Sequence, residues 1–368
     1  MVRPGVVHRF LMRRGGPWQI HVLEIDCRRK DLVIESARAL DLVHGRETTS
    51  SIVARKSNSL KKVVAGVNAD FFDLKTGETV NNQVVQGVIA RALIPQMSAT
   101  GEYRGRRSQI AFTLEGRPLL EQFVFDGKIL WPAGQVTTVG GINVVRARTE
   151  FVLFNSYIGK TTPADSLSRG VVELALVDAG NRRDTLLAVV SGGLRSGGET
   201  RIPQNGMVLS TFRRQGLLDS VGVRTGDTLK VCLGFLPSRP RLRSLVGGIP
   251  RIVLDGRNIA GIPEYLEGAG PEFSSRRHPR TGVGFSRDSS LVYFVTVDGR
   301  QESSVGMSLP EFADLMISLG VYQGLNLDGG GSTTMVVEEK VVNTPSDPTG
   351  ERPVANCLLL MERRVVTE

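Results

Sequence analysis

The sequence predicts an α+β fold of mixed, largely antiparallel sheets with a few flanking helices. Three observations lead to this prediction. Of the 368 residues, 40% are hydrophobic and 23% are charged, as in globular proteins. The 42 glycines far outnumber the 17 prolines, which indicates many tight turns. Short runs of alternating apolar residues recur along the chain, while only two segments have the signals of a helix.

The first two thirds of the chain predict mostly strands. Apolar residues alternate in two runs within residues 17–36, and charged and turn-forming residues bound both runs. A short helix is expected after Thr49, and a strand then runs through VVAGVNADFF to Asp73. An apolar pattern resumes over residues 80–95, and short strands separated by Gly, Asp and Pro fill residues 105–235. The Pro- and Arg-rich stretch LPSRPRLRSLVGG is expected to form a loop near a functional site.

The last third has the clearest elements. LVYFVTVD at residues 291–298 is nearly continuously apolar, which suits a buried strand. Residues 308–319 predict a helix, because Ser308 and Glu311 form a capping-box pair and Gly320 is a suitable stop. The strand GLNLD, the turn GGGSTT and the strand MVVEEKVVN follow.

A possible internal duplication relates two of these segments. Ser50 precedes a helix and a strand that contains Asn68, and Ser308 precedes a helix and a strand that contains Asn326, with 18 residues between the paired positions in both cases. Two pseudo-duplicated β–α–β units around one cleft would present Asp70 and Asp328 from opposing strand ends. A coincidence between two ordinary strand–turn junctions is the competing interpretation.

Charge and cysteine content limit the classes of function. Lys and Arg number 46 against 37 Asp and Glu, a net charge of +9, and 37 of the 46 are Arg, whose planar fork suits phosphate and carboxylate. A mildly basic solvated surface explains the charge equally well. No block of five basic residues and no zinc-finger or RNP-like motif occurs, so nucleic acid is not expected as a partner. Aromatic residues make up only 6%, which disfavours carbohydrate recognition by many stacked rings.

The cysteines and the apolar runs bear on the compartment. Cys27, Cys232 and Cys357 are widely separated and form no CxxC pair. We therefore expect each of them to be a small apolar residue of the core, and one disulfide between two of them is the alternative. No apolar run approaches 18 residues, so no transmembrane segment is expected. The first 16 residues lack the apolar stretch of a signal peptide, which leaves a cytoplasmic protein or one whose leader has been removed.

The segment LNLDGGGSTTM is the strongest candidate for a site. Asn326 and Asp328 are two residues apart on a predicted strand and therefore point to the same face. The glycines allow a sharp turn whose N–H groups can bind an anion, and three hydroxyl residues follow. It is not a nucleotide-binding P-loop, because no Lys follows the glycines at the required position. The candidate residues of this segment are Asn326, Asp328, Gly329, Gly330, Ser332 and Thr333.

Three further segments carry polar residues. In SSRRHPRTGVGF, Arg276, Arg277, His278 and Arg280 bring four cations within five residues, and we expect a rigid loop that binds phosphate, or else a solvated basic loop. In GVNADFF, Asn68 and Asp70 again share a face. Near the C-terminus, VNTPSDPTGERPVANC contains Asn343 and Arg352, although a surface loop explains its composition equally well.

These segments together resemble the phosphodiester glycosidase family. The similarity rests on RHPRTGVG, VTVDGRQESSVGMSLPEFADLMISLG, LNLDGGGSTTMVV and VVNTPSDPTGERPVAN, with VNADFF and GGIPRIVLDG upstream, and it extends over about residues 20 to 362. Ala69 stands where the family usually has Gly, and Gly282 stands where it has Ala. Both changes exchange one small residue for another and leave the polar positions intact.

The resemblance implies hydrolysis of a sugar-1-phosphodiester at its anomeric C–O bond, with free sugar and a phosphomonoester as products. Residues 1–104 and 241–368 would then be the two parts of a catalytic unit, with residues 105–240 as a β-rich subdomain. Asp328, Asp70 and His278 are the expected catalytic residues. The expected substrate- and phosphate-binding residues are Arg277, Arg280, Thr281, Asn68, Asn326, Gly329, Gly330, Ser332, Thr333, Asp298, Asn343 and Arg352. Asp298 could instead belong to a simple turn.

The remaining expectations concern partners and rival functions. The partner would be a small or polymeric sugar phosphodiester, such as a bacterial surface polymer or exopolysaccharide, and a secreted or extracytoplasmic location would follow from the family. One rival is a metal-dependent phosphodiesterase or phosphatase holding Ca²⁺ or Mg²⁺ with Asp70, Asp298 and Asp328. No cofactor is certain, and the scarcity of His disfavours a transition metal. The other rival is a non-catalytic protein that binds anionic glycans on the same scaffold.

Overall fold

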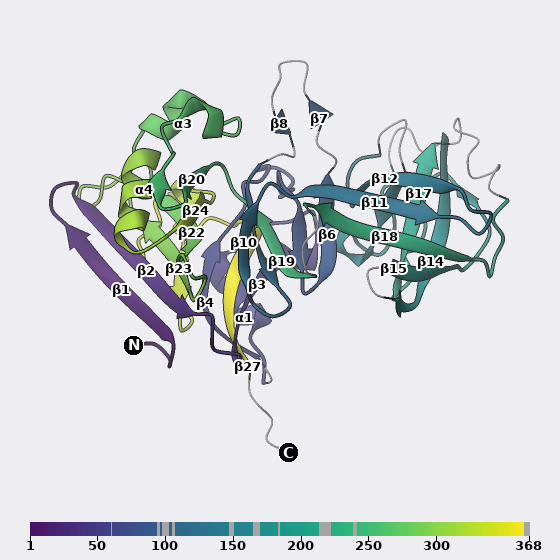
Figure 1. The fold of residues 1–368 in the computed structure, drawn as a ribbon, viewed down its shortest axis with the longest axis horizontal. Coiled ribbons are helices and arrows are strands. Elements are labelled where there is room, and N and C mark those ends of the chain that lie inside the picture. The colour runs from purple at the N-terminus through teal and green to yellow at the C-terminus, as the bar shows by residue number, and fades with distance from the viewer. Residues whose placement is uncertain are drawn as a thin grey trace. The chain divides into compact units, whose positions relative to one another are not determined.

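The protein consists of two compact units, described here from a computed structural model. The structure describes residues 1–59, 61–93, 96–97, 103–104, 107–146, 151–164, 170–182, 185–212, 222–237 and 241–363. The first unit comprises residues 1–88, 97–122 and 240–368, and the second comprises residues 89–96 and 123–239. The chain therefore passes from the first unit to the second twice, at residues 89–96 and at residues 123–239, and returns each time (Figure 1).

Two facing sheets form the body of the first unit. The larger sheet has the order β1-β2-β23-β22-β24-β20-β21, and the smaller has the order β26-β25-β4-β27-β3. Apolar side chains of both sheets, such as Val283 and Leu325 from the first and Val67 and Leu358 from the second, share one core. Burial of this shared apolar surface holds the sheets face to face.

The strands of the larger sheet are β1 (Val6–Arg13), β2 (Trp18–Asp26), β20 (Arg251–Leu254), β21 (Arg257–Asn258), β22 (Arg280–Phe285), β23 (Leu291–Val297) and β24 (Gln323–Asn326). The smaller sheet contains β3 (Leu32–Arg38), β4 (Lys61–Asn68), β25 (Met335–Val337), β26 (Lys340–Val341) and β27 (Asn356–Arg363). The same unit contains the neighbouring strands β5 (Gln83–Val85), β9 (Gln109–Thr113), β10 (Pro118–Glu121) and β19 (Leu242–Gly247). A separate two-stranded pair joins β7 (Gln96–Met97) to β8 (Tyr103–Arg104).

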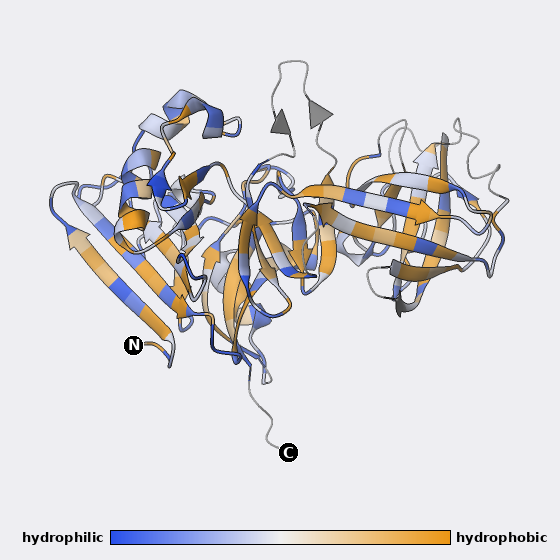
Figure 2. Ribbon diagram, viewed as in Figure 1, coloured by the Kyte–Doolittle hydropathy of each residue, from blue (hydrophilic) through white to orange (hydrophobic). Residues whose placement is uncertain are grey.

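The second unit is a closed barrel of seven strands. Following the pairings leads from β12 through β11, β18, β15, β14, β17 and β13 back to β12, so the ring has no free edge. The β12–β13 pair is parallel, and the other pairs of the ring are antiparallel. Alternating orange and blue bands along β11 and β18 in Figure 2 match the inward and outward alternation of barrel strands.

The ring consists of β11 (Val124–Leu130), β12 (Val136–Ile142), β13 (Phe151–Phe154), β14 (Val171–Arg182), β15 (Thr185–Val190), β17 (Gly206–Phe212) and β18 (Thr228–Leu236). Two further strands pair with it, β6 (Val88–Leu93) with β12 and β16 (Arg195–Ser196) with β14.

The predicted α+β class is wrong, because the protein is mostly β, with 48% strand and 11% helix. The described part of the chain has three α-helices, α1 (Thr49–Lys56), α3 (Pro271–Ser275) and α4 (Leu309–Ser318). The sequence patterns around the two longer helices favoured β–α–β units. The described residues of the barrel in the middle of the chain instead add strands and no α-helix, and short 3₁₀ turns such as Ala39–Asp41, Ser156–Ile158, Pro263–Tyr265 and Gly330–Ser332 make up other connections.

Helix α4 was predicted correctly from its capping signals. Ser308 accepts a hydrogen bond from the Glu311 N–H, and the Glu311 carboxylate accepts one from the Ser308 N–H, which completes the capping box. The apolar face of α4 packs on the larger sheet, where Phe312 reaches Gly282 of β22. A Cβ atom at Gly282 would lie 2.7 Å from the Phe312 ring, so this strand position must stay small.

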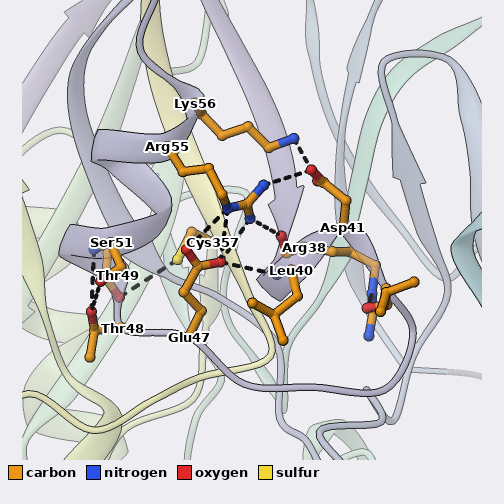
Figure 3. A network of polar contacts seen from close by, with 11 residues as sticks. Arg38, Leu40, Asp41, Glu47, Thr48, Thr49, Ser51, Arg55, Lys56 and Cys357 are labelled. Atoms are coloured by element: carbon orange, nitrogen blue, oxygen red, sulfur yellow. Dashed lines mark hydrogen bonds and ion pairs between the residues drawn. The ribbon is translucent and has the colours of Figure 1, made fainter.

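Helix α1 is tied to the preceding loop by a polar network (Figure 3). Arg55 forms ion pairs with Asp41 at 2.6 Å and Glu47 at 2.7 Å, and Lys56 pairs with Asp41 at 2.5 Å. Thr48 caps the helix by accepting from the Ser51 N–H. These contacts fix the helix against the smaller sheet immediately before β4, the strand that leads to the candidate site.

Several local predictions need correction. The strand predicted to continue to Asp73 ends at Asn68. MVVEEKVVN is a hairpin of β25 and β26 instead of one strand, because Glu338 and Glu339 adopt positive φ. LPSRPRLRSLVGG contains strand β19, and its residues 238–240 lie outside the described residues. All three cysteines are free, and only Cys357 is fully buried.

A buried ion pair lies inside the barrel unit. Arg146 donates to Glu173 at 2.8 Å, and the two side chains are only 2% and 0% exposed. Thr162 and Ser210 donate to the same carboxylate, and Arg146 also donates to Ser210 and the Pro163 carbonyl. Because each partner desolvates the other and both are hydrogen-bonded, loss of one partner would leave a buried charge unpaired.

We expect Arg146→Met to lower the free energy of unfolding of the barrel unit by about 3–5 kcal/mol. The measurement is urea denaturation followed by Trp131 fluorescence in a Trp18→Phe background. Lys128→Met is the matched control, since Lys128 pairs with Asp126 on the barrel surface at 50% exposure and should lose under about 1 kcal/mol. Equal losses for the two variants would contradict a specific role for the buried pair.

Candidate functional site

The site forms where β24 of the larger sheet and β4 of the smaller sheet end beside each other. The Asp328 N–H, two residues past β24, donates to the Ala69 carbonyl, one residue past β4, at 2.8 Å. The chain then turns through residues 329–334 and begins β25 of the smaller sheet at Met335. The glycine turn is therefore the connection between the two sheets, and the two predicted strand-end motifs are adjacent.

Asn68 positions this turn with its side chain. Its amide nitrogen donates to the Asp328 carbonyl at 2.6 Å, and its amide oxygen accepts from the Thr334 N–H at 3.1 Å, so it binds both ends of the turn. The same oxygen accepts from the Thr281 hydroxyl of β22 at 2.8 Å. Asn68 and Thr281 are fully buried. Both were predicted to bind substrate or phosphate, and the structure places both side chains beneath the turn, where they hydrogen-bond to each other.

Asp328 is the accessible carboxylate of the turn. The residue is partly exposed, and its Oδ1 accepts from the Gly329 N–H at 3.0 Å. Desolvation raises the pKa of Asp328 to about 6, while the Ser332 hydroxyl, the Gly329 N–H and the Arg352 charge act in the opposite direction. The carboxylate is therefore mostly ionised at pH 7 and can change protonation state slightly below it.

Two guanidinium groups lie against successive glycines of the turn. A Cβ atom at Gly330 would be 3.0 Å from an Arg300 Nη atom, and one at Gly331 would be 2.4 Å from an Arg352 Nη atom. Gly330 also has φ +62°, a conformation that side chains disfavour. The glycines are needed here because the guanidinium groups occupy the space of a side chain.

Arg300 was missed as a site residue by the sequence analysis. It belongs to the Asp-Gly-Arg segment after β23, which also has the features of an ordinary turn, and it adopts φ +62°. The structure places its Nη2 atom 3.4 Å from the His278 Nδ1 atom. The sequence did contain a signal for Arg300. It is a positively charged residue that follows a buried strand and its polar end, within a motif that resembles the family.

The arginines of the predicted cationic loop make different contacts in the structure. Arg277 forms an ion pair with Glu311 at the start of α4, at 2.5 Å, and lies over the Trp18 ring. Arg280 is buried in β22 and donates to the carbonyls of Phe273, Arg276 and Met307. Its backbone borders Gly329, but its guanidinium supports the loop and α3. Burial lowers the pKa of Arg280 to about 10, so it remains a cation.

His278 lies beside Arg300 and is partly exposed. Desolvation, followed by the charges of Arg280, Arg300 and Arg276, lowers the pKa of His278 below its usual range. The imidazole is therefore neutral at pH 7, and the surrounding guanidinium groups create a positive potential at this position.

Asp70 is close in the fold but enclosed. It is 2% exposed, and its carboxylate accepts from the Asn81 side chain at 2.7 Å and the Asn81 N–H at 3.3 Å. Asn356 accepts from the Asp70 N–H. Desolvation raises the pKa of Asp70 to about 7, while the Asn81 hydrogen bonds act in the opposite direction. Asp70 is thus less accessible to a ligand than Asp328.

Asp298 and Asn343 form a buried pair behind the turn. The Asn343 amide donates to Asp298 at 3.0 Å and to the Thr333 carbonyl at 3.1 Å, and the Thr344 N–H donates to Asp298 at 3.0 Å. Desolvation raises the pKa of Asp298. This pair links the Asp-Gly-Arg segment to the end of the glycine turn and so positions Arg300 relative to Asp328.

Four buried side-chain atoms at the turn lack hydrogen bonds among the described residues. They are the Asn326 Oδ1 atom and the hydroxyls of Ser332, Thr333 and Thr334. The Asn326 amide nitrogen donates to the Ile249 carbonyl, which fixes the side-chain orientation. Buried polar atoms usually have partners, so these four atoms have unused capacity for hydrogen bonding to water or a ligand.

The arrangement of the possible metal-ligating side chains also bears on metal binding. Within the ranges that the structure describes, no group of three or more His, Cys, Asp or Glu residues is arranged to hold a metal ion. The carboxylates of Asp70 and Asp298 each accept two hydrogen bonds from amide N–H groups. Asp70, Asp298 and Asp328 are thus not gathered into the shared Ca²⁺ or Mg²⁺ site considered from the sequence.

Comparisons with known proteins agree with the motif resemblance. The family model described as phosphodiester glycosidase matches residues 184–361. The mouse protein N-acetylglucosamine-1-phosphodiester alpha-N-acetylglucosaminidase is 36% identical over 110 residues, which cover 28% of this chain and 21% of that protein. This chain thus aligns with only about a fifth of that curated relative.

Two solved structures share the fold. A hypothetical protein from Synechocystis matches with a TM-score of 0.74 and 19% identity over 97% of this chain and 62% of that chain. A candidate exported protein from Burkholderia pseudomallei matches with a TM-score of 0.69 and 26% identity over 94% of this chain and 74% of that chain. In the described part of this chain, no helix has the length and hydropathy needed to cross a membrane.

We expect Asn68→Ala to lower the local free energy of opening around the turn by at least about 3 kcal/mol, because the Thr281 hydroxyl, the Thr334 N–H and the Asp328 carbonyl would lose their partner. Hydrogen exchange at the amides of β4 and β25 measures this loss. Asn205→Ala, at an exposed asparagine, is the control and should leave exchange unchanged. Unchanged protection in Asn68→Ala would show that the turn does not depend on this side chain.

Proposed function

We propose that this chain, whose residues 184–361 belong to the phosphodiester glycosidase family, hydrolyses the anomeric C–O bond of a sugar-1-phosphodiester. The products are a free sugar and a phosphomonoester. One observation carries the proposal: the partly exposed Asp328 directly precedes the turn in which Gly330 and Gly331 contact two guanidinium groups. This arrangement pairs a group that can act at the anomeric carbon with groups that can hold the phosphate.

Asp328 is the proposed catalytic carboxylate. In its ionised form it activates water or stabilises the oxocarbenium-like centre that develops at the anomeric carbon. The bond to the phosphate oxygen breaks, and the electron pair leaves with the phosphate. Such a leaving group needs little protonation, so cationic groups can replace the strong general acid of ordinary glycosidases.

The other predicted residues divide into two groups in this proposal. Asn326, Ser332 and Thr333 orient the sugar or the phosphate, supported by the unpaired oxygen of Asn326 and the unpaired hydroxyl of Thr333. His278, neutral and beside Arg300, donates a hydrogen bond to phosphate. The positioning residues are Asn68, Asp70, Thr281, Asp298, Asn343 and Arg280, whereas Arg277, bound to Glu311, has no role in the proposed reaction.

The proposal includes an extracytoplasmic setting. The exported character suggested for the Burkholderia pseudomallei structural neighbour supports this location. We therefore place the substrate among bacterial surface polymers or exopolysaccharides with phosphodiester-linked sugars. The metal-dependent rival receives no support from the arrangement of His, Cys, Asp and Glu side chains in the described residues.

Hydrolysis in ¹⁸O-labelled water tests which bond breaks. With an N-acetylglucosamine-1-phosphodiester as substrate, we expect the label in the sugar hydroxyl and none in the phosphomonoester, with the same rate in the presence of EDTA. Label in the phosphate, or activity that EDTA abolishes, would favour the metal-dependent phosphodiesterase. No turnover over a panel of sugar phosphodiesters and nucleotide sugars would favour the binding protein.

We expect Asp328→Asn to fold normally and to lower turnover by at least about 100-fold. In the unmodified protein, kcat/KM should fall about tenfold per pH unit below about pH 6, because the carboxylate must be ionised. His278→Gln is the control for this pH profile and should retain the acidic limb. Turnover of Asp328→Asn near that of the unmodified protein would remove this residue from the mechanism.

A further inference from the structure

We infer that Arg300 and Arg352 form the phosphate site, and that this site binds a phosphate dianion better than a phosphodiester monoanion. The inference rests on the proposed function and names the part of the substrate that this side of the turn recognises. It keeps Arg352, which the sequence analysis already placed among the phosphate-binding residues, and sets Arg300 in the place of Arg277 and Arg280.

Geometry is the first argument. The Arg300 guanidinium lies against Gly330 with its Cζ 3.4 Å from the position of a Cβ atom, and the Arg352 guanidinium lies against Gly331 with its Cζ at 2.6 Å. Because the two glycines are consecutive, both guanidinium groups contact the same short turn. Asp328 is two residues before Gly330. A sugar at Asp328 would therefore have its anomeric phosphate near the two guanidinium groups.

Available hydrogen-bonding capacity is the second argument. Arg300 is exposed and, within the described ranges, contacts no carboxylate; its recorded polar neighbour is His278. Arg352 uses its Nε atom to bind Asp347 at 2.6 Å, which holds the side chain in place. Its Nη groups, which have no hydrogen bond among the described residues, lie at Gly331 together with the Asp347 Oδ2 atom, which is 2.8 Å from the position of a Cβ atom there. Each arginine can thus present a planar pair of donors to phosphate oxygens.

The other cations of the region are already committed. Arg277 is bound to Glu311, Arg276 pairs with Glu272, and Arg280 donates to three carbonyls inside the fold. These side-chain partners distinguish Arg276, Arg277 and Arg280, which are already bound, from Arg300. Arg276 and Arg280 still contribute positive potential, since together with Arg300 they lower the pKa of His278.

Charge change during the reaction is the third argument. A phosphodiester carries one negative charge, and the departing phosphomonoester carries about −1.5 to −2 at pH 7. As the C–O bond breaks, the electron pair moves onto the phosphate oxygen, and its attraction to two guanidinium groups increases. Interactions that strengthen in the transition state accelerate the reaction, whereas equal binding of substrate and transition state does not.

Calorimetric titration of the full chain tests this inference without using activity. At pH 8, inorganic phosphate should bind at least about 10-fold more tightly than dimethyl phosphate, a monoanionic diester. Arg300→Gln should weaken phosphate binding about 10- to 100-fold, as expected for lost hydrogen bonds to a charged group, and should remove the preference for the dianion. The phosphate affinity of Arg300→Lys should lie between those of the unmodified protein and Arg300→Gln, because lysine keeps the charge but lacks the planar fork.

Arg277→Gln is the matched control and should bind phosphate as the unmodified protein does. Circular dichroism and thermal unfolding of each variant establish that it is folded. The inference is overturned if phosphate does not bind the unmodified protein, if dimethyl phosphate binds equally well, or if Arg277→Gln and Arg300→Gln lose the same affinity. Phosphate binding that depends on Arg300 in a protein without glycosidase activity would uphold this site and reject the proposed function.

Discussion

The side chain of Asn68 is the constraint on which the candidate site depends. A connection between two facing sheets must expose or satisfy the backbone polar groups of its turn, and a buried unpaired group is costly. Asn68 solves this at the end of β4 by donating to the Asp328 carbonyl and accepting from the Thr334 N–H. With both ends of the turn held from below, Asp328 keeps a defined position at the surface.

Burial and hydrogen bonding distinguish Asp70 from Asp328, two aspartates with similar sequence surroundings. Asp70 and Asp328 both follow a strand that ends in an asparagine, yet Asp70 is enclosed by Asn81, while Asp328 remains accessible. Both pKa values are raised because desolvation disfavours the charged carboxylate. A raised pKa alone would not distinguish the two residues, and their accessibility does.

The two units are stabilised by different means. The first unit relies on an apolar core between sheets, with polar side chains satisfying the turns at its edge. The barrel closes its strands on one another and contains the hydrogen-bonded Arg146–Glu173 pair as well as its own apolar core. All proposed site residues belong to the first unit, although residues 123–239 of the barrel lie between them in the chain. The site is therefore assembled by segments that are distant in sequence.

The sequence by itself determined helix α4, the positions of most strands in the last third, the polar strand ends and the resemblance to the phosphodiester glycosidase family, because these depend on local spacing and ordered motifs. It did not determine the mostly β class, because closure of a barrel is a pairing between distant strands with no local signature. Nor did it determine which arginines are free. Only the tertiary structure could decide that, because carbonyls and carboxylates from other segments bind Arg277 and Arg280, whereas Arg300 contacts no carboxylate among the described residues.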